Sequence, residues 1–198
     1  MRVKICGITN LEDAFCAIDS GADALGFVFY EKSPRYILPE DAKKLINSLP
    51  PFVEKVGLFV NASKTEIEEI AKETKITLAQ LHFDIDIKFL DSINFPTLPV
   101  IRAKSKKDLF KFKDRYRLVD TYTKEYGGAG KRLNLEWFED DEVDLSKIIL
   151  AGGLDPENLK DLKNFNFFGV DVSSGVELKK GKKDCTKVKR FIQNAKTL

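Results

Sequence analysis

One repeating pattern limits the fold of this chain more than any other feature of its sequence. A short apolar run is followed by a loop and then by an amphipathic segment with helical spacing, about once every 25 residues. Several runs are continuously apolar, as is typical of strands buried on both faces of a parallel sheet. The predicted strands are residues 2–6, 24–29, 55–60, 78–81, 99–101, 116–119, 147–151 and 168–172.

Helical segments are predicted after these strands, and local signals mark several of their starts. Asn10 and the box at residues 63–66 are typical N-terminal caps, and Pro39 fits the first turn of a helix. Eight strand–helix units predict an α/β fold, the (β/α)8 TIM barrel, in fewer residues than the ~250 typical of it. No linker divides the sequence, so a single domain is expected over residues 1–198. The helices are expected to begin near residues 11, 39, 64, 87, 106, 135, 156 and 186.

Composition and charge exclude several classes of protein. The net charge of +2 argues against a dedicated polyanion binder. Acidic residues interrupt the basic stretches at 104–117 and 179–190, which favours solvated helices over a nucleic-acid surface. No apolar run approaches the ~18 residues of a membrane span, and no signal peptide is visible. The three widely spaced cysteines, Cys6, Cys16 and Cys185, fit a reducing compartment better than a disulfide framework. We therefore expect a globular, cytoplasmic protein that binds neither nucleic acid nor membrane.

Polar residues and glycines gather where the predicted strands end. The carboxyl ends of the strands form the catalytic face of a TIM barrel, whereas the opposite face mainly serves stability. Taken alone, a buried cysteine is more often a small hydrophobe than a catalyst. Polar residues without a function, however, would not gather at the same end of so many strands. The residues at or just beyond these ends are Cys6, His82, Asp120, Gly152, Gly153, Ser173, Ser174 and Gly175, and Arg35 lies in the loop after the second strand.

Two late loops predict a phosphate site. Residues 150–154 and 171–175 follow the seventh and eighth strands, where barrel enzymes often hold phosphate. Glycines let the backbone approach an anion closely, and a helix start adds partial positive charge. The alternative is that these glycines only form tight turns, but two such loops in adjacent positions favour phosphate. Residues 127–131 do not form a P-loop, because the spacer between glycines is too short and Arg132 replaces the required Ser or Thr.

A set of motifs extends over the whole chain. They are KICGIT at 4–9, GADALGFVF at 21–29, SPRYI at 33–37, QLH at 80–82, DT at 120–121 with YGGAG at 126–130, AGGL at 151–154 and DVSSGVE at 171–177. In this order they resemble the phosphoribosylanthranilate isomerase family. The resemblance implies the third step of the tryptophan branch, an Amadori rearrangement of N-(5-phosphoribosyl)anthranilate to 1-(2-carboxyphenylamino)-1-deoxyribulose 5-phosphate. It also implies neither metal nor cofactor, in agreement with a single histidine and no clustered cysteines.

The resemblance implies roles for individual residues. Cys6 matches the general base and Asp120 the general acid, and Arg35 suits the planar carboxylate of anthranilate. One departure is Phe83, which stands where the family usually has Gly, so the shape of the loop after His82 is an open question. The substrate-binding positions implied are Arg35, His82, Gly128, Gly152, Gly153, Asp171, Ser173, Ser174 and Gly175.

The expected chemistry places opposite demands on the two catalytic groups. Asp120 must hold a proton when substrate arrives and Cys6 must be able to lose one, although ordinary pKa values of ~3.9 and ~8.5 favour the reverse at neutral pH. Burial is expected to raise the pKa of Asp120, and a nearby cation to lower the pKa of Cys6. Lys4 is the candidate cation, but Asp171 on the neighbouring strand could pair with Lys4 instead.

Two other functions stay open at this point. One is the aminoaldose–ketose sugar-phosphate isomerase of histidine biosynthesis, whose two-carboxylate design does not explain Cys6. The other is a catalytically silent phosphate-binding barrel, which does not explain the pair of Cys6 and Asp120. The resembling family includes monomers and homodimers, so either state is expected.

Overall fold

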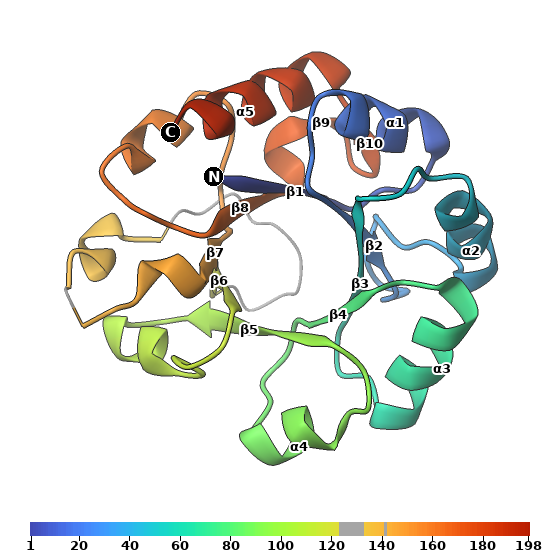
Figure 1. Cartoon of the computed structure of the whole chain (residues 1–198), viewed down its shortest axis with the longest axis horizontal. Coiled ribbons are helices and arrows are strands. Elements are labelled where there is room, and N and C mark those ends of the chain that lie inside the picture. The colour runs from blue at the N-terminus through green and yellow to red at the C-terminus, as the bar shows by residue number, and fades with distance from the viewer. Residues whose placement is uncertain (123–132, 141) are drawn as a thin grey trace.

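The computed structural model describes residues 1–122, 133–140 and 142–198. In these ranges, eight parallel strands close into one barrel in the order of the sequence, with β1 paired to β8. Figure 1 shows the strands around the centre and the helices outside them, so the expected (β/α)8 architecture is confirmed. The strands are β1 (Arg2–Cys6), β2 (Ala24–Val28), β3 (Glu54–Phe59), β4 (Leu78–Leu81), β5 (Thr97–Ala103), β6 (Arg117–Thr121), β7 (Ile148–Leu150) and β8 (Gly169–Val172).

The first four strands and the last are followed by α-helices, and three of these helices start at the expected signals. The Asn10 side chain accepts a hydrogen bond from the Asp13 amide, and Ser63 accepts one from the Glu66 amide. Pro39 is the first residue of its helix. The α-helices are α1 (Leu11–Asp19), α2 (Pro39–Asn47), α3 (Lys64–Thr74), α4 (Ile87–Ser92) and α5 (Cys185–Thr197). Within the ranges described, no helix is both long and apolar enough to cross a membrane.

The units after β5 and β7 differ from the prediction. The helix expected at 106–112 is the 3-10 helix η1 (Lys106–Phe110), and the helix expected from Pro156 is only η4 (Leu159–Leu162). In η4, Leu159 and Leu162 are buried three residues apart, a spacing that suits a 3-10 helix of three residues per turn. The other 3-10 helices described are η2 (Leu135–Phe138), η3 (Leu145–Lys147) and η5 (Ser174–Val176). These short connections help to explain how the barrel fits into 198 residues.

An antiparallel hairpin that the sequence did not predict follows β8. It consists of β9 (Glu177–Lys179) and β10 (Lys182–Lys183), joined through Gly181 at φ +81°. The hairpin overlaps the start of the basic stretch at 179–190, for which solvated helices were expected. That assignment is wrong for Lys183, whose side chain is fully buried.

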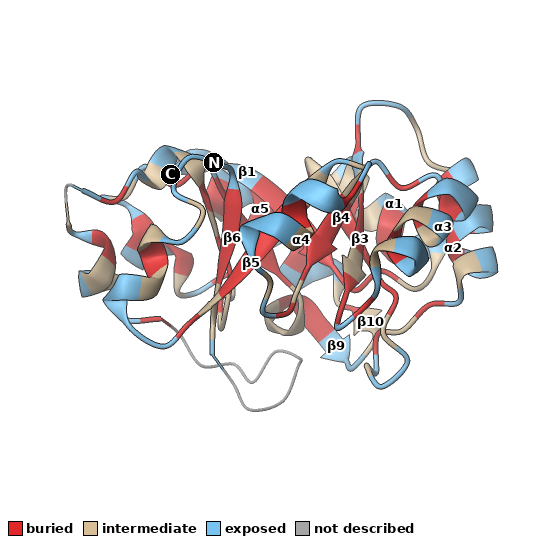
Figure 2. Cartoon of the chain, turned by 90° about the horizontal axis from the view of Figure 1, so that it is seen from below, coloured by how far each residue is buried: buried red, intermediate tan, exposed pale blue. Residues whose placement is uncertain are grey.

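Alternation along the strands separates two buried regions. Val3 and Ile5 pack outward in the main core between strands and helices, while Lys4 and Cys6 face the barrel interior. A second apolar cluster of Leu98, Val100, Leu118 and Ala151 belongs to β5, β6 and the end of β7. Figure 2 shows the strands buried and the outer faces of the helices exposed. The barrel therefore holds polar side chains on β1 and β8 and a separate apolar cluster on β5, β6 and the residue after β7.

A disulfide joins Cys16 of α1 to Cys185 at the start of α5. The two residues are 169 positions apart, and closure of the barrel brings their Cα atoms to 5.9 Å. The expectation that the cysteines form no disulfide is therefore wrong for this pair, while Cys6 is a buried free thiol. Figure 1 shows that α1 and α5 are neighbours. The spacing of the cysteines in the sequence did not reveal this.

We expect the double variant Cys16→Ser/Cys185→Ser to lose about 2–4 kcal/mol of unfolding free energy, because a cross-link over a long loop restricts the unfolded chain. Urea denaturation of the oxidised wild type and the double variant measures the difference. Added reductant should destabilise the wild type and leave the double variant unchanged. Three reactive thiols in the unfolded, unreduced wild type would contradict this expectation.

Candidate active site

A cavity opens among the carboxyl ends of the strands. It brings together residues from the ends of β1, β4, β6, β7 and β8 and from the loop after β2, as the sequence predicted. Gly175 does not line the cavity but packs against Leu154, which does, and Gly128 falls outside the described residues. The predicted site residues that line the cavity are Cys6, Arg35, His82, Asp120, Gly152, Gly153, Asp171, Ser173 and Ser174.

Cys6 ends β1 and is almost fully buried at the bottom of this cavity. Burial raises the pKa of the Cys6 thiol above its ordinary value, and the charge of Asp171 adds to the increase, while Lys4 and Lys183 oppose it. The expectation that a cation lowers this pKa overall is therefore wrong: in the free protein desolvation outweighs the cations. Cys6 is protonated at neutral pH.

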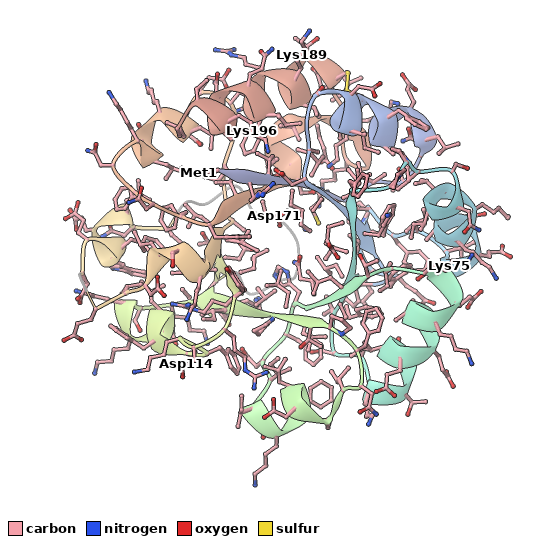
Figure 3. All side chains as sticks on the ribbon, in the orientation of Figure 1. Met1, Lys75, Asp114, Asp171, Lys189 and Lys196 are labelled. Atoms are coloured by element: carbon pink, nitrogen blue, oxygen red, sulfur yellow. A yellow bond between two sulfur atoms is a disulfide. The ribbon has the colours of Figure 1, made fainter. Side chains whose placement is uncertain are left out.

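Lys4 has two partners in the barrel interior. Its ammonium lies 2.8 Å from Asp171 Oδ1, and both side chains are about nine-tenths buried or more. Lys4 also interacts with Cys6 through its charge and a hydrogen bond. Figure 3 places Asp171 inside the ring of strands. The sequence left open whether Lys4 acts on Cys6 or pairs with Asp171. In the structure it does both.

Asp120 lies near the end of β6, where the Thr121 amide donates a 2.7 Å hydrogen bond to its Oδ1. Burial raises the pKa of Asp120 to about 6, with a further increase from Asp171, as expected from its place in the cavity. Gly152 packs directly against it, since a Cβ there would lie 2.6 Å from Asp120 Oδ1. Gly152 also has φ +86°, so a side chain is excluded by both conformation and space.

His82 contacts the carboxyl group of Asp120 from the end of β4. Its Nε2 is 3.5 Å from Asp120 Oδ2, and Gln80 Nε2 lies 3.5 Å from its Nδ1. Burial lowers the pKa of His82 to about 3, so the ring is neutral. If Gln80 donates to Nδ1, the ring proton is on Nε2 and points at Asp120. Phe83, the departure from the family pattern, packs edge-on against Phe89 of α4 at 5.8 Å.

Arg35 is buried and already holds a carboxylate. Its Nε and Nη2 donate hydrogen bonds of 2.7 and 2.8 Å to the two oxygens of Glu177 on β9. This bidentate pair fixes the plane of the guanidinium against the cavity. Gly7 supports it, because a Cβ at that position would lie 2.6 Å from Arg35 Cδ.

The two glycine loops predicted to bind phosphate are in contact. Gly152 and Gly153 both have positive φ. A Cβ on Gly175 would lie 1.9 Å from the Leu154 carbonyl oxygen, so that glycine lets one loop rest on the other. The Ser173 hydroxyl donates to the Cys6 carbonyl oxygen at 3.1 Å and joins the same region to β1.

Three residues of the site were missed from the sequence. Gln80 is buried in the cavity wall, and in the described part of the chain its Oε1 has no hydrogen-bond partner. Glu177 and Lys183 form a buried ion pair behind Arg35 and Ser173. Gln80 could have been predicted, because it is a polar residue on the inward face of the strand at 78–81. Lys183 could not be distinguished from the other lysines of its basic stretch. Among residues with described positions, no group of three or more His, Cys, Asp or Glu side chains could hold a metal.

Comparison with known proteins identifies relatives over the full chain. A family model described as N-(5'-phosphoribosyl)anthranilate (PRA) isomerase matches residues 3–194. The isomerase of that name from Sulfurovum sp. is 62% identical over 198 residues, covering 100% of both chains.

Solved structures agree with this match. Phosphoribosylanthranilate isomerase from Thermotoga maritima is 41% identical with a TM-score of 0.86, and both chains are covered completely. A structure of such an isomerase in complex with reduced 1-(o-carboxyphenylamino)-1-deoxyribulose 5-phosphate is 40% identical with a TM-score of 0.87, again over both complete chains. The chain belongs to the N-(5'-phosphoribosyl)anthranilate isomerase family.

Proposed function

We propose that this chain converts N-(5-phosphoribosyl)anthranilate to 1-(2-carboxyphenylamino)-1-deoxyribulose 5-phosphate, the third step of the tryptophan branch. The observation that carries this proposal is the cavity that Cys6 and Asp120 share, in which the pKa of Asp120 is raised to about 6. A carboxyl group with a pKa near the working pH is suited to general acid catalysis. The relatives named above, one of them bound to a reduced analogue of this product, support the same reaction.

In the proposed mechanism, the two groups act in sequence on one sugar. Asp120 gives its proton to the furanose ring oxygen, the C1–O bond breaks, and the nitrogen lone pair forms a protonated Schiff base. Cys6 then removes the C2 proton, and the C2–H electrons form the enolamine as the positive charge on nitrogen is neutralised. Tautomerisation of the enolamine gives the ketone, so substrate and product are isomers. The cationic Schiff base beside C2 both acidifies that proton and favours the Cys6 thiolate.

The surrounding residues are proposed to bind the substrate and hold the acid. The neutral His82 ring, with Nε2 3.5 Å from Asp120 Oδ2, is proposed to orient the carboxyl group of Asp120 in both of its protonation states. Arg35 uses N–H groups other than those on Glu177 for the anthranilate carboxylate. We propose that Gly152, Gly153, Ser173, Ser174 and Gly175 hold the phosphate, that Asp171 orients Lys4, and that Gly128 contributes from the loop after β6.

The remaining expectations about the whole protein stay proposals. We propose one domain over residues 1–198, which acts in the cytoplasm on a small molecule, as a monomer or homodimer. The net charge of +2 supports the absence of a nucleic-acid partner.

The test is to generate the labile substrate in situ from anthranilate and a phosphoribosyl donor, and to follow anthranilate fluorescence as the purified chain is added. We expect rapid consumption of the adduct and a product that matches the deoxyribulose phosphate by mass. Binding of that product without turnover would instead identify a silent phosphate-binding barrel. Turnover of the histidine-pathway aminoaldose alone would identify the other isomerase.

The pH profile of kcat/KM is predicted to be bell-shaped. The active form carries a proton on Asp120 and none on Cys6, and its population is constant between the two pKa values and falls outside them. The acidic limb should therefore lie near pH 6, from Asp120, and the basic limb above the ordinary thiol value of ~8.5. Initial rates between pH 5 and 10 check both limbs. An acidic limb near pH 4 would show that burial does not shift Asp120.

A further inference from the structure

Lys183 is a buried cation that the proposed mechanism does not yet use. Its side chain is 0% exposed, and lysine is almost never fully buried unless it is paired. The ammonium lies 3.2 Å from both the Ser173 carbonyl oxygen and Glu177 Oε1, and 3.5 Å from the Ser173 hydroxyl. Lys183 therefore connects the hairpin to the loop that is proposed to hold phosphate.

The partner of Lys183 is shared with a second cation. Glu177 accepts two hydrogen bonds from Arg35, one from Lys183, and a 3.3 Å bond from the Gly181 amide. Two positive charges thus meet one carboxylate behind the cavity. In the barrel interior, Lys4 and Asp171 balance one another. With Lys183 protonated, the buried group of five charges has one positive charge in excess, before any charge on Cys6 is counted. Burial lowers the pKa of Lys183, while Glu177 and Cys6 oppose that decrease.

Cys6 lies where this excess charge acts. The charged groups that face it are Lys4 from its own strand, Asp171 from β8, Arg35 from the loop after β2, and Lys183 from β10. Ser173 adds a structural connection, since its hydroxyl donates to the Cys6 carbonyl oxygen and its own carbonyl accepts from Lys183. A thiolate at Cys6 would neutralise the group as a whole.

We propose that Lys183 is a positioning residue for the general base: its ammonium supplies the excess positive charge that stabilises the Cys6 thiolate, and it holds Ser173 of the phosphate loop against the end of β1. This inference rests on the proposed function, in which Cys6 must lose a proton. Lys183 acts through Cys6 and Ser173 and needs no contact with the substrate.

The hairpin backbone is anchored independently of this ammonium. Asp13 Oδ2 accepts a 2.8 Å hydrogen bond from the Lys183 amide, and Asp13 Oδ1 lies 2.7 Å from the ammonium of Lys182. Replacing the Lys183 side chain therefore leaves the main-chain anchor in place. Lys182 is a matched control. It immediately precedes Lys183 and forms its ion pairs with Asp13 and Glu12 outside the cavity.

The experiment compares Lys183→Met and Lys183→Gln with Lys182→Met. Cys16 and Cys185 are joined, so Cys6 is the free thiol that iodoacetamide alkylates in the unreduced protein. Alkylation rates between pH 7 and 11 give the pKa of Cys6 without any substrate. Both Lys183 variants should shift the alkylation profile to higher pH by about one unit, so that alkylation at pH 8 is roughly tenfold slower. The Lys182 variant should match the wild type.

Turnover adds a second readout. The basic limb of kcat/KM should move with the alkylation profile in both Lys183 variants. Folded Lys183 variants with the wild-type alkylation profile, or an equal shift in Lys182→Met, would overturn the proposal. Loss of folding in both neutral variants, seen by circular dichroism, would assign Lys183 a purely structural role and would overturn it as well. A shifted profile in a chain that does not turn over the substrate would instead refute the proposed function alone.

Discussion

Asp120→Asn is expected to lower kcat by about 10²- to 10⁴-fold, the usual contribution of a positioned general acid. The amide has nearly the same shape and can still accept the hydrogen bond from the Thr121 amide, but it cannot give a proton to the ring oxygen. The fluorescence assay measures the loss, and the acidic limb near pH 6 should disappear from any residual activity. A kcat within a few fold of the wild type would exclude Asp120 as the acid.

The same variant is expected to be more stable than the wild type above pH 6. The folded state raises the pKa of Asp120 from 3.8 to about 6, so it favours the protonated form, and ionisation costs stability as pH rises between these values. A shift of this size corresponds to about 3 kcal/mol, which a neutral Asn avoids. Urea denaturation at pH 8 should therefore show a gain that vanishes below pH 4.

Asp108→Asn is a control of opposite sign. Desolvation acts to raise the pKa of Asp108, but the ion pair with Lys111 and the hydrogen bonds from the Lys104 and Ser105 amides together lower it to about 2. Its charge therefore adds stability above the unfolded value of 3.8, and the Asn variant should be less stable at pH 8 with unchanged kcat. Equal effects of both substitutions on stability would contradict the assigned pKa directions.

The strand order and the end of the barrel that carries the cavity could be predicted because both depend on local patterns. A buried parallel strand is apolar along its whole length, and the polar residues that end it are adjacent in sequence. After β5 and β7 the sequence predicted helices where the structure has short 3-10 helices. Few apolar positions follow these two strands, so the period of a helix could not be read there. Leu109 is the buried residue of η1, and a single anchor does not define the period of a helix.

The charges around Cys6 could not be derived from the sequence. Glu177 and Arg35 are 142 residues apart and Lys4 and Asp171 are 167 apart, so only the closed barrel makes them partners. The direction of the Cys6 pKa shift could not be predicted for a similar reason. Sequence identifies Lys4 as a nearby cation, but how completely the thiol is desolvated depends on every element packed around it.

The second large effect is expected for Cys6→Ser, which should also lower kcat by about 10²- to 10⁴-fold. A serine hydroxyl ionises far less readily than a thiol, so the excess positive charge near Cys6 cannot convert it to a base at any pH at which the chain is folded. The smaller oxygen fits the space, where the Sγ now packs against Gly26. The fold should therefore be retained, as thermal unfolding will show.

The two catalytic variants should stop the reaction at different points. Without the acid the furanose ring stays closed, whereas without the base the ring can open but the C2 proton is not removed. Deuterium at C2 should therefore slow Cys6→Ser more than it slows the wild type, because cleavage of the C2–H bond becomes limiting, and it should leave Asp120→Asn unaffected. Cys16→Ser is the matched control, since it removes a cysteine sulfur outside the cavity and should keep the wild-type kcat at 25 °C. Near-wild-type turnover in both Cys6→Ser and Asp120→Asn would rule out the assignment of acid and base.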